Sequence, residues 1–141
     1  MQTLKGDNYI VRYDEINCIF YGIYDAVVTT QSTAALYIAA SQLLASIDIN
    51  AIRGIVMDFR RVERFDKGNI VTVQRENHTI NHKFDLSHIP VALVVDTPLQ
   101  EQIVDYTSKV TPDHDRKQIV FSIAEAYIFF DEWHQEHCAS A

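Results

Sequence analysis

The stretch Pro90–Pro98, PVALVVDTP, decides the class of fold. Its first six residues are apolar, and a run of this length that ends at a charged residue predicts a strand buried on both faces of a sheet. Thr97 then offers a helix-capping hydroxyl, and Pro98 suits the first position of a helix. The stretch therefore indicates a buried strand that runs directly into a helix, as in α/β domains.

The same pattern of strand and then helix occurs on both sides of this stretch. Upstream, residues 53–59 (RGIVMDF) predict a second buried strand, and apolar residues at helical spacing predict a helix over 69–83. Downstream, residues 118–121 predict a short strand, and Ser122 with Glu125 resembles a capping box that starts a last helix. The helix that begins at Pro98 is predicted to bury the stripe Leu99, Ile103, Tyr106 and Val110.

The N-terminal part reads differently, because two β-rich segments follow each other without a helix between them. Residues 9–13 and 16–24 are rich in Ile, Val, Tyr and Phe and predict an antiparallel hairpin. A helix with Thr29 as a candidate cap follows. Over residues 1–141 we therefore expect a single α/β domain of order β-β-α-β-α-β-α-β-α, with a mixed, mostly parallel sheet of about five strands and about four helices.

Composition limits the class of partner. The chain has 141 residues, of which 48% are apolar, and its net charge is -7. An acidic chain without clustered Lys and Arg argues against nucleic acid as the main ligand. No apolar run approaches the roughly 20 residues that span a bilayer, and no signal peptide is visible. We expect a cytoplasmic protein with no membrane span.

The pattern Asp58, Val62 and Asp66 before a helix resembles the signature loop of STAS domains, the sulfate-transporter and anti-sigma-factor-antagonist modules. The family pattern runs roughly D-L-S-x-V-x-x-x-D-S-S-G-L, and Phe59 falls on its Leu. The predicted order of elements also agrees over nearly the whole chain. The PVALVVDT junction resembles the divergent bacterial branch called sporulation-antagonist-like, or STAS/Sec14-like. The resemblance implies a non-enzymatic regulatory module that binds a protein partner or forms a homodimer.

One departure from the family concerns regulation. In partner-switching antagonists the second Asp is followed by a serine that a kinase phosphorylates, whereas Lys67, Gly68 and Asn69 stand here. This chain therefore cannot gain phosphoserine charge at that position. We still expect the loop to bind a partner, with positive charge from its basic residues and Phe65 either as an exposed apolar anchor or packed inward. The predicted binding residues are Asp58, Arg60, Arg61, Arg64, Phe65, Asp66, Lys67, Gly68 and Asn69.

Two alternatives remain open at this level. The Sec14-like side of the resemblance suggests a small-molecule or lipid-binding domain, whose cavity would be lined by the aromatic residues Phe20, Tyr24, Tyr37 and Phe129. A less favoured alternative is a metal-dependent phosphotransfer or hydrolase activity, in which Asp58 and Asp96 at the ends of two strands hold Mg²⁺.

No motif in the sequence specifies a catalysed reaction. The sequence contains no Gly-rich phosphate loop and no CxxC, and nothing in it follows the order of a Ser-His-Asp triad. His78 and His82 have the i, i+4 spacing of metal ligands but lack the Glu of HExxH, so a solvated helix face is the simpler interpretation. We therefore expect no catalytic residues, no cofactor and no metal.

Overall fold

The computed structural model describes residues 2–109, 111 and 114–138, which form one six-stranded sheet and four α-helices. The strands are β1 (Gln2–Gly6), β2 (Tyr9–Asp14), β3 (Ile19–Val28), β4 (Gly54–Phe65), β5 (Val91–Val94) and β6 (Lys117–Val120). The helices are α1 (Thr30–Leu44), α2 (Asn69–Lys83), α3 (Pro98–Lys109) and α4 (Ile123–Cys138), with short 3-10 turns at Ile49–Ala51 and His114–Arg116. The predicted α/β class and the helix over 69–83 are confirmed.

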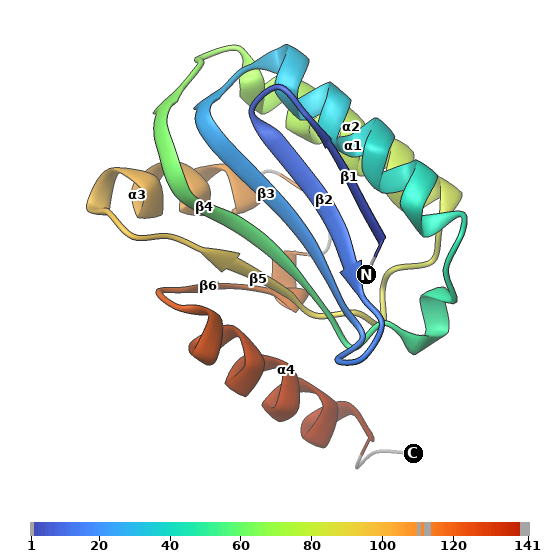
Figure 1. The fold of residues 1–141 in the computed structure, drawn as a ribbon. Coiled ribbons are helices and arrows are strands. Elements are labelled where there is room, and N and C mark those ends of the chain that lie inside the picture. The colour runs from blue at the N-terminus through green and yellow to red at the C-terminus, as the bar shows by residue number, and fades with distance from the viewer. Residues whose placement is uncertain (1, 110, 112–113, 139–141) are drawn as a thin grey trace.

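The order of strands in the sheet follows the order in the sequence. β1, β2 and β3 pair antiparallel, and β3 to β6 pair parallel. Because parallel crossovers are right-handed and each one here steps in the same direction, the three connecting helices fall on one face. Figure 1 shows α1, α2 and α3 on that face and α4 alone on the other. Apolar cores fill both sides of the sheet.

The sheet has one strand more than the expected five, because no pattern in residues 2–6 predicts β1. All five of its residues are exposed, so it lacks the alternation of apolar and polar residues that marks a half-buried strand. It pairs with β2 through a two-residue turn in which Asn8 has φ 67°, a left-handed conformation that Asn tolerates. The turn between β2 and β3 spans residues 15–18, later than the two-residue turn that we expected.

The helix termini follow the predicted capping residues. Thr29 caps α1 in a reciprocal box with Ser32, and Ser122 accepts a hydrogen bond from the backbone N–H of Glu125 at the start of α4. The stripe predicted for α3 is wrong, because Leu99 and Tyr106 are exposed. Of its other members, Ile103 is half-buried and Val110 lies outside the described residues. The buried residues of α3 are instead Gln100 and Val104.

Candidate functional site

The segment predicted as a loop after Asp58 is largely strand. β4 continues to Phe65, because residues 25–28 of β3 extend beside it and supply parallel partners for residues 61–65. This extension of β4 was not predicted, because most of its residues are polar. Val62 is nevertheless buried between exposed neighbours. The true loop before α2 is only Asp66–Gly68. Gly68 has φ −75°, so it does not need the positive φ that a glycine permits.

Asp58 lies within β4 and is 6% exposed. Arg60 stands two residues further on the same face of the strand and forms a two-pronged ion pair with it, from Nε to Oδ1 (3.0 Å) and from Nη2 to Oδ2 (2.9 Å). The hydrogen bond to Asp58 raises the pKa of the Arg60 guanidinium above its ordinary value. Both oxygens of Asp58 therefore already have a cationic partner.

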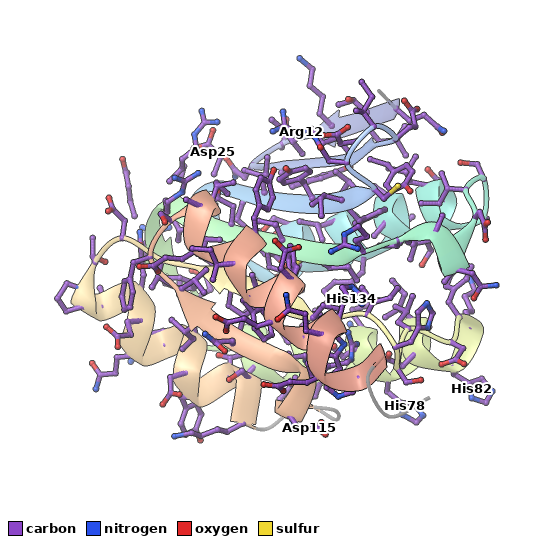
Figure 2. The ribbon with its side chains drawn as sticks, turned by 90° about the horizontal axis from the view of Figure 1, so that it is seen from below. Arg12, Asp25, His78, His82, Asp115 and His134 are labelled. Atoms are coloured by element: carbon purple, nitrogen blue, oxygen red, sulfur yellow. The ribbon has the colours of Figure 1, made fainter. Side chains whose placement is uncertain are left out.

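The ion pair between Asp58 and Arg60 bears on the alternative in which Asp58 and Asp96 hold Mg²⁺. Asp96 follows the end of β5 and is exposed, whereas Asp58 is neutralised by Arg60 inside the fold. Among the residues that the structure describes, no three side chains of the metal-binding types come together. His78 and His82 stack on the solvent side of α2, and Figure 2 shows both of them at the edge of the molecule.

Two of the other basic residues of the segment, Arg61 and Arg64, also have carboxylate neighbours. Arg61 pairs with Asp25 of β3 at 3.3 Å, and Arg64 lies 3.9 Å from Asp66. These pairs are exposed, so each contributes little stability. They nevertheless offset the local positive charge that we expected from the sequence.

Phe65 packs inward, which decides between the two positions that the sequence left open. Its ring lies 6.2 Å from that of Phe59, and Phe59 stacks on Tyr24 at 5.4 Å. The three rings lie on the side of the sheet that α1, α2 and α3 cover, where they line a cavity. The segment after Asp58 therefore contributes to an interior site, and Phe65 is not an anchor on the surface.

The cavity has a volume of about 370 Å³ and lies between the sheet and three helices. α2 packs mainly on α1, and α3 stands apart from both of them on the same face of the sheet (Figure 1). Apolar side chains from three strands and three helices form most of the lining: Phe20, Tyr24, Leu36, Ala40, Ile55, Met57, Phe59, Phe65, Ile70, Val73, Leu93, Ile103 and Val104. Of the four aromatic residues predicted to line such a cavity, Phe20, Tyr24 and Tyr37 do so, whereas Phe129 belongs to the opposite core.

One end of the cavity lies at the start of α2, where Asp66, Lys67 and Asn69 contribute to its wall. Asn69 is 8% exposed, and its Oδ1 atom is buried without a hydrogen-bond partner. Buried polar atoms in native proteins nearly always have a partner, so each exception needs an explanation. The atom has almost no accessible surface, so a ligand in the cavity would reach it only if the Asn69 side chain turned.

The described residues at the other end of the cavity are mostly polar and include two cationic side chains, those of Lys117 and Arg116. Lys117 donates from Nζ to Oγ1 of Thr111 (2.8 Å) and lies 3.5 Å from Oδ1 of Asn77. Asn77 donates in turn to the hydroxyl of Tyr37 at 2.6 Å. Arg116 is 4% exposed and donates from Nη1 to the carbonyl of Ile89. These polar groups converge on an otherwise apolar lining, as ligand sites in proteins do.

Sequence reasoning missed two residues that build this site. Gln100 holds α3 against β4, and its signal was present as the capping box Thr97-x-x-Gln100, in which the Gln100 backbone N–H donates to Oγ1 of Thr97. Arg116 lies in a stretch that looked like an ordinary polar loop before the last strand. A buried arginine in such a loop has no signature in a single sequence.

The sheet order and the helix that follows each parallel strand define an α/β domain of STAS-like fold, as the resemblance predicted. A solved structure with this fold is that of an anti-sigma factor antagonist from Mycobacterium paratuberculosis. It superimposes with a TM-score of 0.54 over 89% of this chain and 97% of its own, at 12% sequence identity. The sequence matches no protein-family profile, and no curated protein matches it.

Proposed function

We propose that this chain is a non-enzymatic binding module of STAS-like fold, and that it binds a small, largely apolar molecule in the cavity under α2. The cavity carries the proposal, because its volume of about 370 Å³ falls in the range of small-molecule sites and its lining is mainly apolar. The polar side chains at its two ends support the proposal, because a few polar groups on an otherwise apolar lining are typical of ligand sites.

The size of the cavity sets the size of the ligand. One water molecule takes about 30 Å³ of liquid, so 370 Å³ corresponds to roughly twelve non-hydrogen atoms. A linear alcohol of ten carbons is a probe of this size. Binding of such a molecule to the folded state alone raises the melting temperature.

The test compares two phenylalanine substitutions on one helix. Val73 is half-buried and lines the cavity, whereas Val71 is 67% exposed on the same helix. We expect n-decanol to raise the melting temperature of the wild type and of Val71→Phe, but not that of Val73→Phe, in which the new ring fills the cavity. Ile103→Phe, on the α3 side of the lining, is the second variant if Val73→Phe does not fold. An unchanged wild-type melting temperature with saturating decanol would reject the proposal.

Native mass spectrometry of gently purified protein provides an independent test. A bound molecule would add a discrete mass that disappears on denaturation, and Val73→Phe would lack this mass while Val71→Phe would keep it. A mass that stays on Val73→Phe would place the ligand outside the cavity.

The likeness in fold to an anti-sigma factor antagonist favours a second function, which is regulation by binding to a protein partner or to another copy of the chain. The surface for this role consists of the exposed residues Arg61, Arg64 and Lys67. Phosphorylation of the family type has no acceptor here, because residues 67–69 carry no hydroxyl and Thr72 is only 5% exposed.

Charge reversal tests this second function. Arg61→Glu with Arg64→Glu should abolish self-association in sedimentation or capture of a partner, because both side chains are mostly exposed. Arg75→Glu with Lys83→Glu makes the same change in charge on the outer face of α2 and should have no effect. Equal association of both double variants would exclude this surface.

A further inference from the structure

The face of the sheet that carries α4 is covered only in part. α4 packs mainly on β5 and β6, whereas α1 packs on β1, β2 and β3 from the opposite face. Ile10 of β2 belongs to the core on the α4 side, and its cross-strand partner in β1 is Lys5. Two residues further on, Arg12 lies opposite Thr3 on the same face. We call these four residues of β1 and β2 the open strip, and Figure 2 shows its Arg12 on the N-terminal strands, clear of α4.

The open strip is positively charged. The Arg12 guanidinium stacks on the ring of Tyr21, with Cζ 4.8 Å from the ring centroid, and its Nε atom is buried without a hydrogen-bond partner. Within the part of the chain that the structure describes, neither Arg12 nor Lys5 forms an ion pair. Asp14 at the end of the strip is held by hydrogen bonds from the turn that follows it. The two cations therefore lack an anionic partner within the fold.

The outer side of α4 has the opposite charge. The helix contains four acidic residues and no Lys or Arg. Ile128 and Glu132 lie one turn apart on the side away from the buried Ala126 and Phe130, and Ile128 is 57% exposed. Glu132 has no ion pair with any residue that the structure describes. α4 thus presents an acidic surface around an exposed apolar side chain.

We propose that two copies of this chain form a two-fold dimer in which α4 of each copy lies on the open strip of the other, with Glu132 beside the partner's Arg12. The strip and the outer side of α4 occur side by side on one face, so a two-fold axis between them brings both complementary pairs together at once. The inference rests on the second proposed function, because it names another copy of the chain as a partner. It gives that copy a surface separate from Arg61 and Arg64, whose charge reversal then reports on the capture of a different protein.

The dimensions of the two surfaces match. Two strands make a strip about 10 Å wide, which is the width of one helix, and the 16 residues of α4 are about 24 Å long. The two contacts together bury about 1,000 Å², which is at the lower end for a specific interface. The dimer is therefore reversible and forms as the protein concentration rises.

Sedimentation velocity from micromolar to submillimolar concentrations tests the dimer through a charge exchange. We expect the wild type to show a concentration-dependent species of twice the chain mass. Glu132→Arg and Arg12→Glu should each raise the dissociation constant at least about tenfold, because each places like charges together. The double variant Arg12→Glu with Glu132→Arg should return to within about threefold of the wild-type constant, because the two charges are exchanged.

Glu101→Arg is the matched control, because Glu101 is exposed on α3, on the other face of the sheet, and the change in charge is the same. Equal dissociation constants for Glu132→Arg and Glu101→Arg would overturn the inference. A monomeric wild type would also overturn it and would leave the open strip to an acidic helix of another protein. If Arg12→Glu does not fold, Ile128→Asp at an exposed position is the second variant and should weaken the dimer as well.

The same measurement separates this inference from the second proposed function. If Arg61→Glu with Arg64→Glu abolishes self-association and Glu132→Arg does not, the inference fails and the surface of Arg61 and Arg64 is the site of self-association. Loss of the dimer in Glu132→Arg alone, with rescue by the charge exchange, supports the inference.

Discussion

Gln100 attaches α3 to the edge of β4, and its replacement by leucine should destabilise the fold. The side chain is 3% exposed and donates from Nε2 to the carbonyls of Val62 (2.8 Å) and Arg60 (3.3 Å). Its Oε1 accepts from the backbone N–H groups of Asp96 (2.7 Å) and Thr97 (3.2 Å). β5 ends opposite Asp58, so these β4 carbonyls lack a strand partner on that side.

The expected magnitude follows from these bonds. Loss of the bond to Val62 leaves an orphaned buried carbonyl, which costs about 1–3 kcal/mol, and the short bond from Asp96 contributes about 1 kcal/mol, so Gln100→Leu should lower the free energy of unfolding by about 2–4 kcal/mol. Gln102→Leu is the control, because Gln102 is exposed on the same helix and its replacement should stay within about 0.5 kcal/mol.

Urea unfolding followed by far-ultraviolet circular dichroism measures this difference. The midpoint for Gln100→Leu should fall by roughly 1–2 M relative to Gln102→Leu. Gln100→Glu isolates the donor half, because it keeps an acceptor for the two N–H groups but turns a second carboxylate oxygen toward the Val62 carbonyl. That carboxyl should have a raised pKa in the folded state, so the variant should be more stable at pH 4 than at pH 7, relative to the wild type. Coincident unfolding curves for Gln100→Leu and Gln102→Leu would refute the role of Gln100.

Three further predictions concern the backbone and the tyrosines. Gly54→Ala should destabilise the protein, since a Cβ there would lie 2.5 Å from the ring of Phe130. Gly68→Ala is its control and should change the free energy of unfolding by less than about 1 kcal/mol, because Gly68 has a helical φ and a Cβ there would make only an ordinary contact with Thr30, whereas alanine is a poorer N-cap than glycine. Thermal unfolding compares the two variants. Ala26→Gly should raise the free energy of unfolding by about 0.5–1 kcal/mol, because Ala26 has φ 57° in a bulge of β3 and glycine removes that strain. Urea unfolding measures the change, and a lower free energy of unfolding in the variant would contradict the prediction. Burial raises the pKa of Tyr24 to about 12, so stability should fall as pH rises from about 10 to 12, and Tyr24→Phe should show a shallower fall over that range.

The parts of the fold that the sequence predicted are those with a clear hydrophobic pattern or clear helix-capping residues. The strand before Asp96 was predicted because burial on both faces leaves a continuous apolar run. The helix over 69–83 was predicted because burial on one face leaves apolar residues at helical spacing. β1 and the end of β4 were missed because their exposed, polar residues carry no such pattern. Backbone pairing alone makes these segments strands, and a partner strand cannot be seen in a local window of sequence.

The predicted binding segment overlaps the lining of the cavity only in part. Four of the nine expected binding residues, Phe65, Asp66, Lys67 and Asn69, line the cavity, although they were expected to form an outer surface. A cavity is space that packed elements leave unfilled, so it depends on how α2 and α3 settle on the sheet and not on any single residue. The direction of Phe65 and the buried charge of Arg116 depend on the same packing, which is why composition and spacing could not assign them.

The sheet has two halves. In one half the paired residues are close together in the sequence, and in the other they are far apart. The antiparallel strands β1, β2 and β3 are connected by turns of two and four residues, whereas each parallel pair from β3 to β6 must close a long crossover that contains a helix. Folding rates fall as the sequence separation of contacts rises, so the N-terminal meander should form early and the parallel pairings should limit the rate. β3 belongs to both halves, and a substitution in it should therefore slow refolding more than an equally destabilising one in β6.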